Sequence, residues 1–266
     1  MQVNYTAPHW PWEGPGDEAL ARQITERTKA GVQPLPVLHV DGGSLARYGE
    51  LVEAMDTGIG RILDALDETG QADDTLVVFC SDNGGERYSF MWPFLGEKGD
   101  LTEGGIRTPL IARWPVRMVG GQVSDAANIP MDWMATFVDA AGARPAPTHP
   151  MDGVSLLPWL VDGAPYPEHD LVWRCRDQGA IRRGRLKYLY DTRPRRLMPT
   201  MPRWDGPHDL LFDVADDGRE VANLAAVHPD DVRELRAAYR AVADDLLPYG
   251  PEPQWAPPPV LVDDPD

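Results

Sequence analysis

Apolar residues recur every three or four positions between residues 44 and 68. This spacing predicts an amphipathic helix, with Gly70 as its expected stop. After a short polar turn, residues 75–80 form a continuous apolar and β-branched run. Such a run is typical of a strand buried on both faces, as in a parallel sheet flanked by helices. A helix, a short turn and a buried strand make half of an α/β unit.

The same pattern predicts elements along the rest of the chain. An apparent strand covers residues 3–7, a second buried strand covers 106–114, and a helix at 131–141 ends at Gly142. Four short strands are expected at 170–175, 179–182, 185–190 and 210–214, followed by an amphipathic helix at 229–246. The sequence therefore predicts an α/β protein in which helices flank a largely parallel or mixed sheet. A small antiparallel sheet with one helix follows that core.

Composition excludes several classes of protein. The chain has 266 residues, 42% of them hydrophobic, and a net charge of −17, which argues against a nucleic-acid binder. Two cysteines, Cys80 and Cys175, cannot form a disulfide framework, and Cys80 is expected to be a small buried hydrophobe within its strand. The sequence has neither a signal-peptide pattern nor an apolar run of membrane-spanning length. We therefore expect a cytoplasmic protein with no membrane partner.

Charge is unevenly distributed. Residues 174–203 contain ten Lys and Arg residues against Asp177 and Asp191, a net charge of +8, so the rest of the chain has −17 − 8 = −25. A basic segment could guide an anionic substrate or contact another polypeptide. The alternative, which we favour, is a solvated hairpin with its own salt bridges.

Polar residues directly after the predicted strand suggest a functional site. Asp82 and Asn83 precede Gly84 and Gly85 at a strand's carboxyl end, where open α/β sheets bind ligands. Their oxygen atoms suit Ca²⁺ or Mg²⁺, although an ordinary strand-to-loop turn has the same composition. Lys98 lies between glycines on the following loop and could bind an anionic substrate or simply be solvated.

Taken together, these segments resemble the sulfatase family. The similarity comprises residues 75–85, Gly-Glu-Lys-Gly at 96–99, Glu-Gly-Gly-Ile-Arg-Thr-Pro at 103–109 and Arg-Trp-Pro at 113–115. Residues 5–11, which contain His9, look like the family's histidine-bearing strand end. Residues 152–157 resemble its domain junction, and 211–214 with 220–225 resemble its C-terminal signature. Order and spacing agree over most of the chain.

The resemblance implies a hydrolase of small-molecule sulfate monoesters, of the arylsulfatase type. Asp82 and Asn83 then correspond to two ligands of a divalent cation, usually calcium. Lys98 corresponds to the lysine that binds the sulfate oxygens, and His9 to the histidine beside the leaving-group oxygen. Two alternatives remain open: a phosphonate or phosphodiester hydrolase of the same superfamily, and a non-catalytic remnant that binds a partner chain.

The sequence also departs from the family pattern. The family's nucleophile is a formylglycine made within a Cys/Ser-x-Pro-x-Arg motif, and this sequence contains no such motif. We therefore expect a sulfatase-type sheet that is only partial. Residues 1–150 would be the C-terminal part of the catalytic α/β domain, 151–247 a small α+β subdomain, and 248–266 a Pro/Asp-rich tail. Exposed strands would then favour a homo-oligomer, or an upstream fragment would complete the domain.

Overall fold

The computed structural model describes residues 1–10, 12–14, 16–19, 22–23, 26, 30, 43–145, 148, 150–175, 178–191 and 209–246. These residues form two compact units, one drawn from residues 1–72 with 87–89 and the other from 73–86 with 90–247. The predicted tail at 248–266 and residues 176–177 and 192–203 of the basic segment lie outside the described residues. The predicted division near residue 150 stays a prediction. Among the described helices, none has the length and hydrophobicity of a membrane span.

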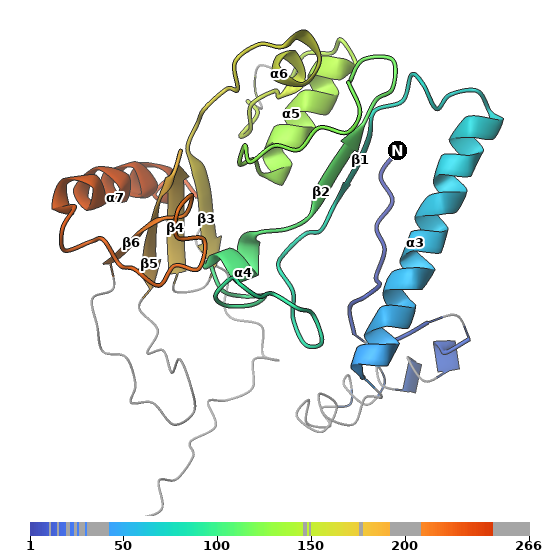
Figure 1. Ribbon diagram of the computed structural model, residues 1–266, viewed down its shortest axis with the longest axis horizontal. Helices are drawn as coiled ribbons and strands as arrows, with labels where there is room; N and C mark the ends of the chain where they lie inside the picture. The colour runs from blue at the N-terminus through green and yellow to red at the C-terminus, as the bar shows by residue number, and fades with distance from the viewer. Residues whose placement is uncertain are drawn as a thin grey trace, which may run out of the picture. The chain divides into compact units, whose positions relative to one another are not determined.

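The first unit is built around helix α3 (Leu45–Glu68), which confirms the predicted helix (Figure 1). Ser44 caps its start, because the Ser44 hydroxyl accepts a hydrogen bond from the Arg47 amide at 3.1 Å. The helix ends where Gly70 adopts a left-handed backbone, φ 68°. Residues 1–6 contain no strand, so the strand expected at 3–7 is wrong. That segment instead runs along α3, with the Tyr5 ring against Gly58.

The second unit begins with an antiparallel pair of strands, β1 (Val77–Cys80) and β2 (Leu110–Arg113). The strand at 75–80 is confirmed, but its expected parallel, fully buried setting is wrong. Its residues are half-buried, except for Cys80, which is exposed rather than a buried hydrophobe. An apolar β-branched run specifies an extended backbone, whereas burial depends on which elements cover it. The second predicted strand is shorter than expected, since β2 begins only after Pro109 and Ile106 belongs to the short helix α4 (Glu103–Ile106). Its expected burial is also wrong, because Leu110 and Ile111 are exposed.

Helices α5 (Pro130–Ala140) and α6 (Leu157–Asp162) follow, and α5 confirms the predicted helix. Buried Asp132 joins α5 to the segment before α6, because its carboxylate accepts hydrogen bonds from the amides of Ile129 and Val154, both at 3.0 Å. Gly153 is required at this junction, since a Cβ there would lie 2.2 Å from the carbonyl carbon of Met131. The predicted junction at 152–157 is therefore a closely packed turn.

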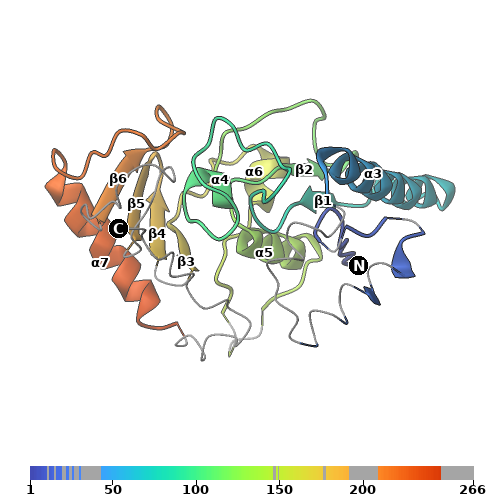
Figure 2. The same cartoon turned by 90° about the horizontal axis from the view of Figure 1, so that it is seen from below.

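A four-stranded antiparallel sheet and helix α7 (Pro229–Ala243) complete the unit and confirm the predicted C-terminal α+β arrangement. The strands are adjacent in chain order: β3 (Leu171–Cys175), β4 (Gln178–Arg183), β5 (Leu186–Asp191) and β6 (Asp209–Asp213). Helix α7 packs against this sheet, mainly on β4 (Figures 1 and 2). As a whole, the described part confirms a mixed α/β protein.

Alternation along these strands gives the sheet two apolar faces. One face packs on α7 through a cluster made of Ile181, Tyr188, Leu211, Val232 and Leu235. The opposite face holds a second cluster made of Leu101, Ala180, Leu189, Phe212 and Val214. Leu101 comes from the loop that contains Lys98, so that loop is anchored on the face of the sheet remote from α7.

Candidate active site

The Asp82–Asn83 turn follows directly from β1. The Ser81 hydroxyl donates a hydrogen bond to the Asn83 carbonyl at 3.1 Å, and the Gly84 amide donates to the Gly105 carbonyl at 2.8 Å. A Cβ on Gly84 would lie 2.0 Å from the Gly104 carbonyl oxygen. Glycine is therefore required here by close approach of two backbones, and that approach fixes the turn against α4.

Lys98 lies on a second turn that is hydrogen-bonded to the first. The Lys98 amide donates to the Gly85 carbonyl at 2.8 Å, two residues beyond Asn83. Gly96 and Gly99 on either side have φ values of 82° and 92°, which side chains disfavour. The Lys98 ammonium lies 3.7 Å from a Glu86 carboxylate oxygen. The structure thus brings Lys98 to the Asp82–Asn83 turn, as the sequence pattern suggested.

Asp82 and Asn83 fit a hard cation as part of a larger ligand set. Their side chains touch, because the Asn83 amide nitrogen donates to an Asp82 carboxylate oxygen at 2.9 Å. Turning that amide by half a rotation would place its oxygen beside the carboxylate, an arrangement that a cation favours. Calcium takes six to eight oxygen ligands. In the part of the chain that the structure describes, no three His, Cys, Asp or Glu side chains gather as a metal site. Among the described residues, Asp82 and Asn83 therefore have no neighbouring group of such side chains that would complete a calcium site.

Formylglycine does not fit this sequence. Neither cysteine is followed by the Pro and Arg of the required motif, and Cys80 instead precedes Ser81 and Asp82. The residues of this chain therefore do not supply that nucleophile.

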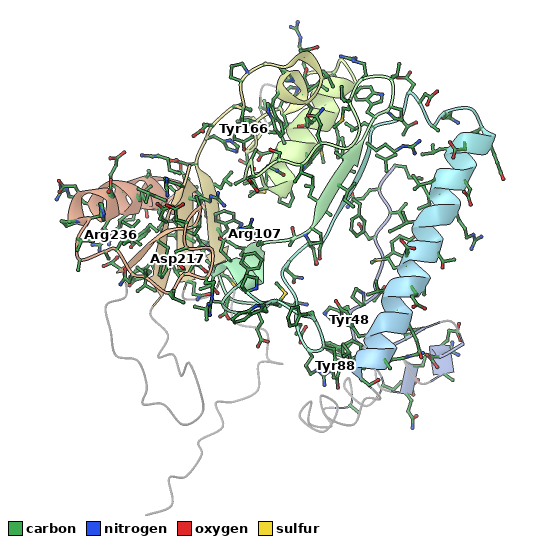
Figure 3. The ribbon with its side chains drawn as sticks, in the orientation of Figure 1. Tyr48, Tyr88, Arg107, Tyr166, Asp217 and Arg236 are labelled. Carbon is green, nitrogen blue, oxygen red and sulfur yellow. The ribbon has the colours of Figure 1, made fainter. Side chains whose placement is uncertain are left out.

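Aromatic side chains lie between the two turns in sequence. Phe90 is 84% exposed and Trp92 is 63% exposed, and the Trp92 ring lies under the Arg219 guanidinium at 4.5 Å. Arg107, at the end of α4, lies over the Phe94 ring at 4.7 Å (Figure 3). The segment therefore presents apolar surface together with cationic groups.

His9 belongs to the first unit. It is exposed, its amide donates to the Thr6 carbonyl at 2.8 Å, and its ring lies 5.7 Å from that of Trp10. In the same unit, buried Trp12 packs edge-on against Tyr88 at 5.3 Å, with Arg87 over its ring. Trp12 thus has a packing role in the first unit, and the catalytic role expected of His9 stays a prediction.

Sequence reasoning missed a buried group of charges behind α4. The Lys187 ammonium lies 2.9 Å from carboxylate oxygens of both Glu103 and Glu220, and all three side chains are almost completely buried. The charge pattern alone places Lys187 within a solvated basic hairpin. A signal was present: Lys187 lies two residues before Leu189, on the apolar side of an alternating strand.

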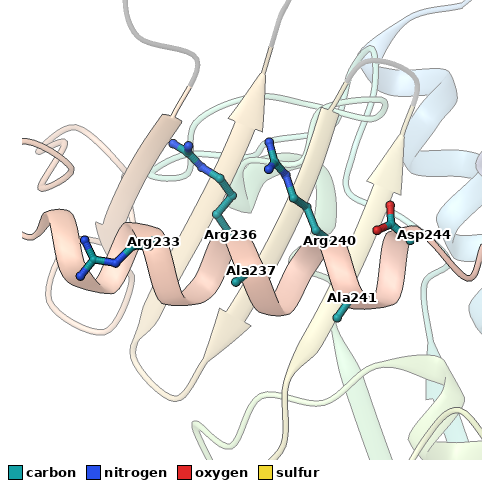
Figure 4. A pocket seen from close by; sticks show the side chains of 6 residues that line it. All are labelled: Arg233, Arg236, Ala237, Arg240, Ala241 and Asp244. Carbon is teal, nitrogen blue, oxygen red and sulfur yellow. The ribbon is translucent and has the colours of Figure 1, made fainter.

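Two other cations in the described part of the basic hairpin have the predicted salt bridges. Arg183 pairs with Asp170 at 2.7 Å and with Glu234, and Arg185 pairs with Asp213 and Asp216. A concave surface along α7 is also lined by arginines (Figure 4). There Arg233 pairs with Asp230 and Arg236 with Asp209, so these cations are used within the fold.

Comparisons with known proteins bear directly on the two turns. A family model described as Sulfatase matches residues 1–143, which include both. An uncharacterized sulfatase of Schizosaccharomyces pombe is 29% identical over 314 residues, covering 87% of this chain and 55% of that protein. The steryl-sulfatase of Mus musculus is 40% identical over 178 residues, covering 59% of this chain and 28% of the relative.

Solved structures agree with this result. The crystal structure of Ps i-CgsB is similar with a TM-score of 0.69 and 25% identity, over 91% of this chain and 49% of that chain. The chain thus spans about half the length, or less, of the proteins it matches. Because the family model covers more than half of the 266 residues, the chain belongs to the sulfatase family.

Proposed function

We propose that the protein hydrolyses sulfate monoesters, as an arylsulfatase-type enzyme, with Lys98, Asp82, Asn83 and His9 as site residues and with a nucleophile that an upstream fragment supplies. The hydrogen bond from the Lys98 amide to the Gly85 carbonyl carries the proposal. It holds the backbone of Lys98 beside a turn whose two side chains carry oxygen ligands. The singly charged sulfate group of the ester binds a cationic side chain, and a divalent cation binds oxygen ligands.

The proposed roles follow from where charge develops. A nucleophile from the upstream fragment attacks sulfur as the S–O ester bond breaks, and negative charge develops on the sulfuryl oxygens and on the departing alkoxide. The Lys98 ammonium binds those oxygens, and its distance of 3.7 Å from Glu86 leaves room for exchange of partners. The His9 imidazole donates a proton or hydrogen bond to the leaving oxygen. Calcium, held in part by Asp82 and Asn83, would supply further positive charge to the sulfate.

The exposed aromatic residues support a flat, apolar organic group on the substrate. Phe90 and Trp92 lie on the segment that joins the two turns, with 84% and 63% of their surfaces exposed. Aromatic faces bind flat rings favourably. The name of one relative, steryl-sulfatase, also denotes an ester of a polycyclic apolar alcohol. We therefore propose aryl or similarly flat sulfate esters as the substrate class.

We also propose that copies of the chain associate through β2. Leu110 and Ile111 lie on this strand with 37% and 63% exposure. Apolar strand residues with that exposure favour pairing with another copy.

Turnover of 4-nitrophenyl sulfate with calcium present, measured for the chain alone and for the chain co-expressed with an upstream fragment, tests the activity. Lys98→Met should lower kcat/KM by roughly 100-fold or more, because it removes a charge that stabilises the transition state. Arg233→Met is the matched control, since it removes an exposed cation on α7 and should leave turnover unchanged. Absence of turnover by the wild-type chain both alone and with the fragment would overturn the proposal, as would turnover confined to a phosphonate or phosphodiester.

Calcium titration tests the metal ligands separately from turnover. Asp82→Ala should weaken calcium binding by about 100-fold or more, because loss of even an indirect partner of a metal costs about 10- to 100-fold. Asp125→Ala removes an exposed carboxylate of the same unit and should bind calcium as the wild type does. Equal affinities of the three proteins would exclude Asp82 as a ligand.

A further inference from the structure

The buried charges behind α4 are connected to the proposed sulfate site through contacts with α4. Lys187 is the second residue of β5, and its side chain has no exposed surface. It lies 2.9 Å from Glu103, the first residue of α4, and 2.9 Å from Glu220, which follows β6. The Glu103 amide donates to the other Glu220 oxygen at 2.6 Å. Lys187 and Glu220 together therefore hold α4 at its first residue, through both side chain and backbone.

The charges in this group balance. Arg107 lies 3.5 Å from the second Glu103 oxygen, so two cations face two carboxylates. Burial of an ion pair gives little net stability on its own, because desolvation offsets the attraction. Loss of one partner is costly, however, because the remaining charge stays buried. We therefore expect this group to fix the position of α4 rather than to add to the stability of the fold.

Helix α4 is hydrogen-bonded to both turns of the site. The Gly105 carbonyl accepts from the Gly84 amide at 2.8 Å, next to Asn83. The Gly104 amide donates to the Leu95 carbonyl at 2.7 Å, at the start of the Lys98 turn. The same loop is held on the sheet by the buried Gln178 side chain, whose oxygen accepts from the Leu101 amide at 3.1 Å. A shift of α4 would therefore move both turns.

We infer that Lys187, with its partners Glu103 and Glu220, is a positioning residue that sets the place of Lys98 relative to Asp82 and Asn83. The inference rests on the proposed function for the role of Lys98, and on the hydrogen bonds of α4 for the mechanical link. Lys187 itself touches no substrate in this arrangement. It acts through α4.

Backbone hydrogen exchange tests the link without any need for activity. In Lys187→Met, the amides of Gly84, Lys98 and Gly104 should exchange on the order of 100-fold faster, because an uncompensated buried carboxylate loosens α4. Amides within β3 to β6 should keep their protection. Arg183→Met is the matched control: this cation of the same sheet also pairs with two carboxylates, Asp170 and Glu234, but lies away from α4. Unchanged exchange at the three amides in Lys187→Met would overturn the inference.

A double-mutant cycle distinguishes positioning from general destabilisation. If Lys187 acts through Lys98, Lys187→Met lowers kcat/KM in the wild-type background but adds no further loss in Lys98→Met. Equal losses in both backgrounds would overturn the inference. If the wild-type chain shows no turnover both alone and with the upstream fragment, the proposed function fails, while hydrogen exchange still decides whether Lys187 positions the loop.

Glu220→Gln is the second variant in case Lys187→Met does not fold. It keeps the size and the acceptor for the Glu103 amide while removing one charge next to Lys187. The same three amides should exchange faster, by a smaller factor than in Lys187→Met. Faster exchange throughout the sheet, without a preference for these amides, would contradict the inference.

Discussion

Glu220 is a carboxyl group whose protonation is coupled to folding. Burial raises its pKa, mainly by desolvation of the charged form, and Lys187 offsets only part of that effect. The folded protein therefore holds this proton more tightly than the unfolded chain does. As pH rises from the ordinary glutamate value of 4.5 through the raised pKa, this group's contribution to the free energy of unfolding decreases.

Glu220→Gln should flatten that part of the stability profile. Because glutamine does not ionise, its free energy of unfolding should fall less than that of the wild type as pH rises above 4.5. Urea denaturation at a series of pH values measures this difference. Glu234→Gln, which alters an exposed carboxylate on α7, should follow the wild-type profile. Parallel profiles for the wild type and Glu220→Gln would contradict the assignment.

Among the elements, the turn after β1 depends on a close approach between backbones. A Cβ on Gly84 would lie 2.0 Å from the Gly104 carbonyl oxygen, so Gly84→Ala must push the turn after β1 away from α4. Overpacking of this kind costs roughly 1–3 kcal/mol. We expect Gly84→Ala to lower the free energy of unfolding by about that amount in chemical denaturation. Gly120→Ala has open space around it and should change stability by less than ~0.5 kcal/mol. Equal effects of the two would be inconsistent with the packing described.

Elements with a strong periodic pattern were predictable. Helices α3 and α7 have an apolar face, which leaves a period of 3.6 in the sequence, and strands β3 to β6 are short apolar runs whose side chains alternate between two faces. Helix α4 was not predictable, because its four residues include Gly104 and Gly105 and carry no period. Its position depends on contacts with β5 and the segment after β6, which a local pattern does not contain.

The part of the site that depends on local sequence was predictable as well. Asp82, Asn83 and Lys98 were found because polar residues after a strand and a lysine between glycines are local signals, and the structure brings those two turns together. The buried contacts of Glu103 were missed because Lys187 and Glu220 lie 84 and 117 residues away from it. A sequence pattern that covers one element has no information on such pairs.

For the molecule as a whole, we expect the two-stranded sheet to affect the proposed association. Within the described residues, β1 and β2 pair only with each other, and Ile111 on β2 is 63% exposed. Ile111→Lys should reduce self-association, since a charge on an edge strand opposes strand pairing. Sedimentation over a range of concentrations measures it. Val123→Lys, at a 96% exposed position outside the strands, should associate as the wild type does. Equal association of all three proteins would show that β2 is not part of the interface.

The hydrogen bond between the Glu103 amide and Glu220 also has a consequence for the order of events in biosynthesis. Its two ends are 117 residues apart. At translation rates of about 5–20 residues per second, the carboxylate that holds α4 is made about 6 to 23 s after the residue it holds. The Lys98 turn therefore emerges from the ribosome well before its anchor exists. A chaperone that binds nascent chains would bind this loop before it is anchored. The final structure of the site would form only after Glu220 has also emerged from the ribosome.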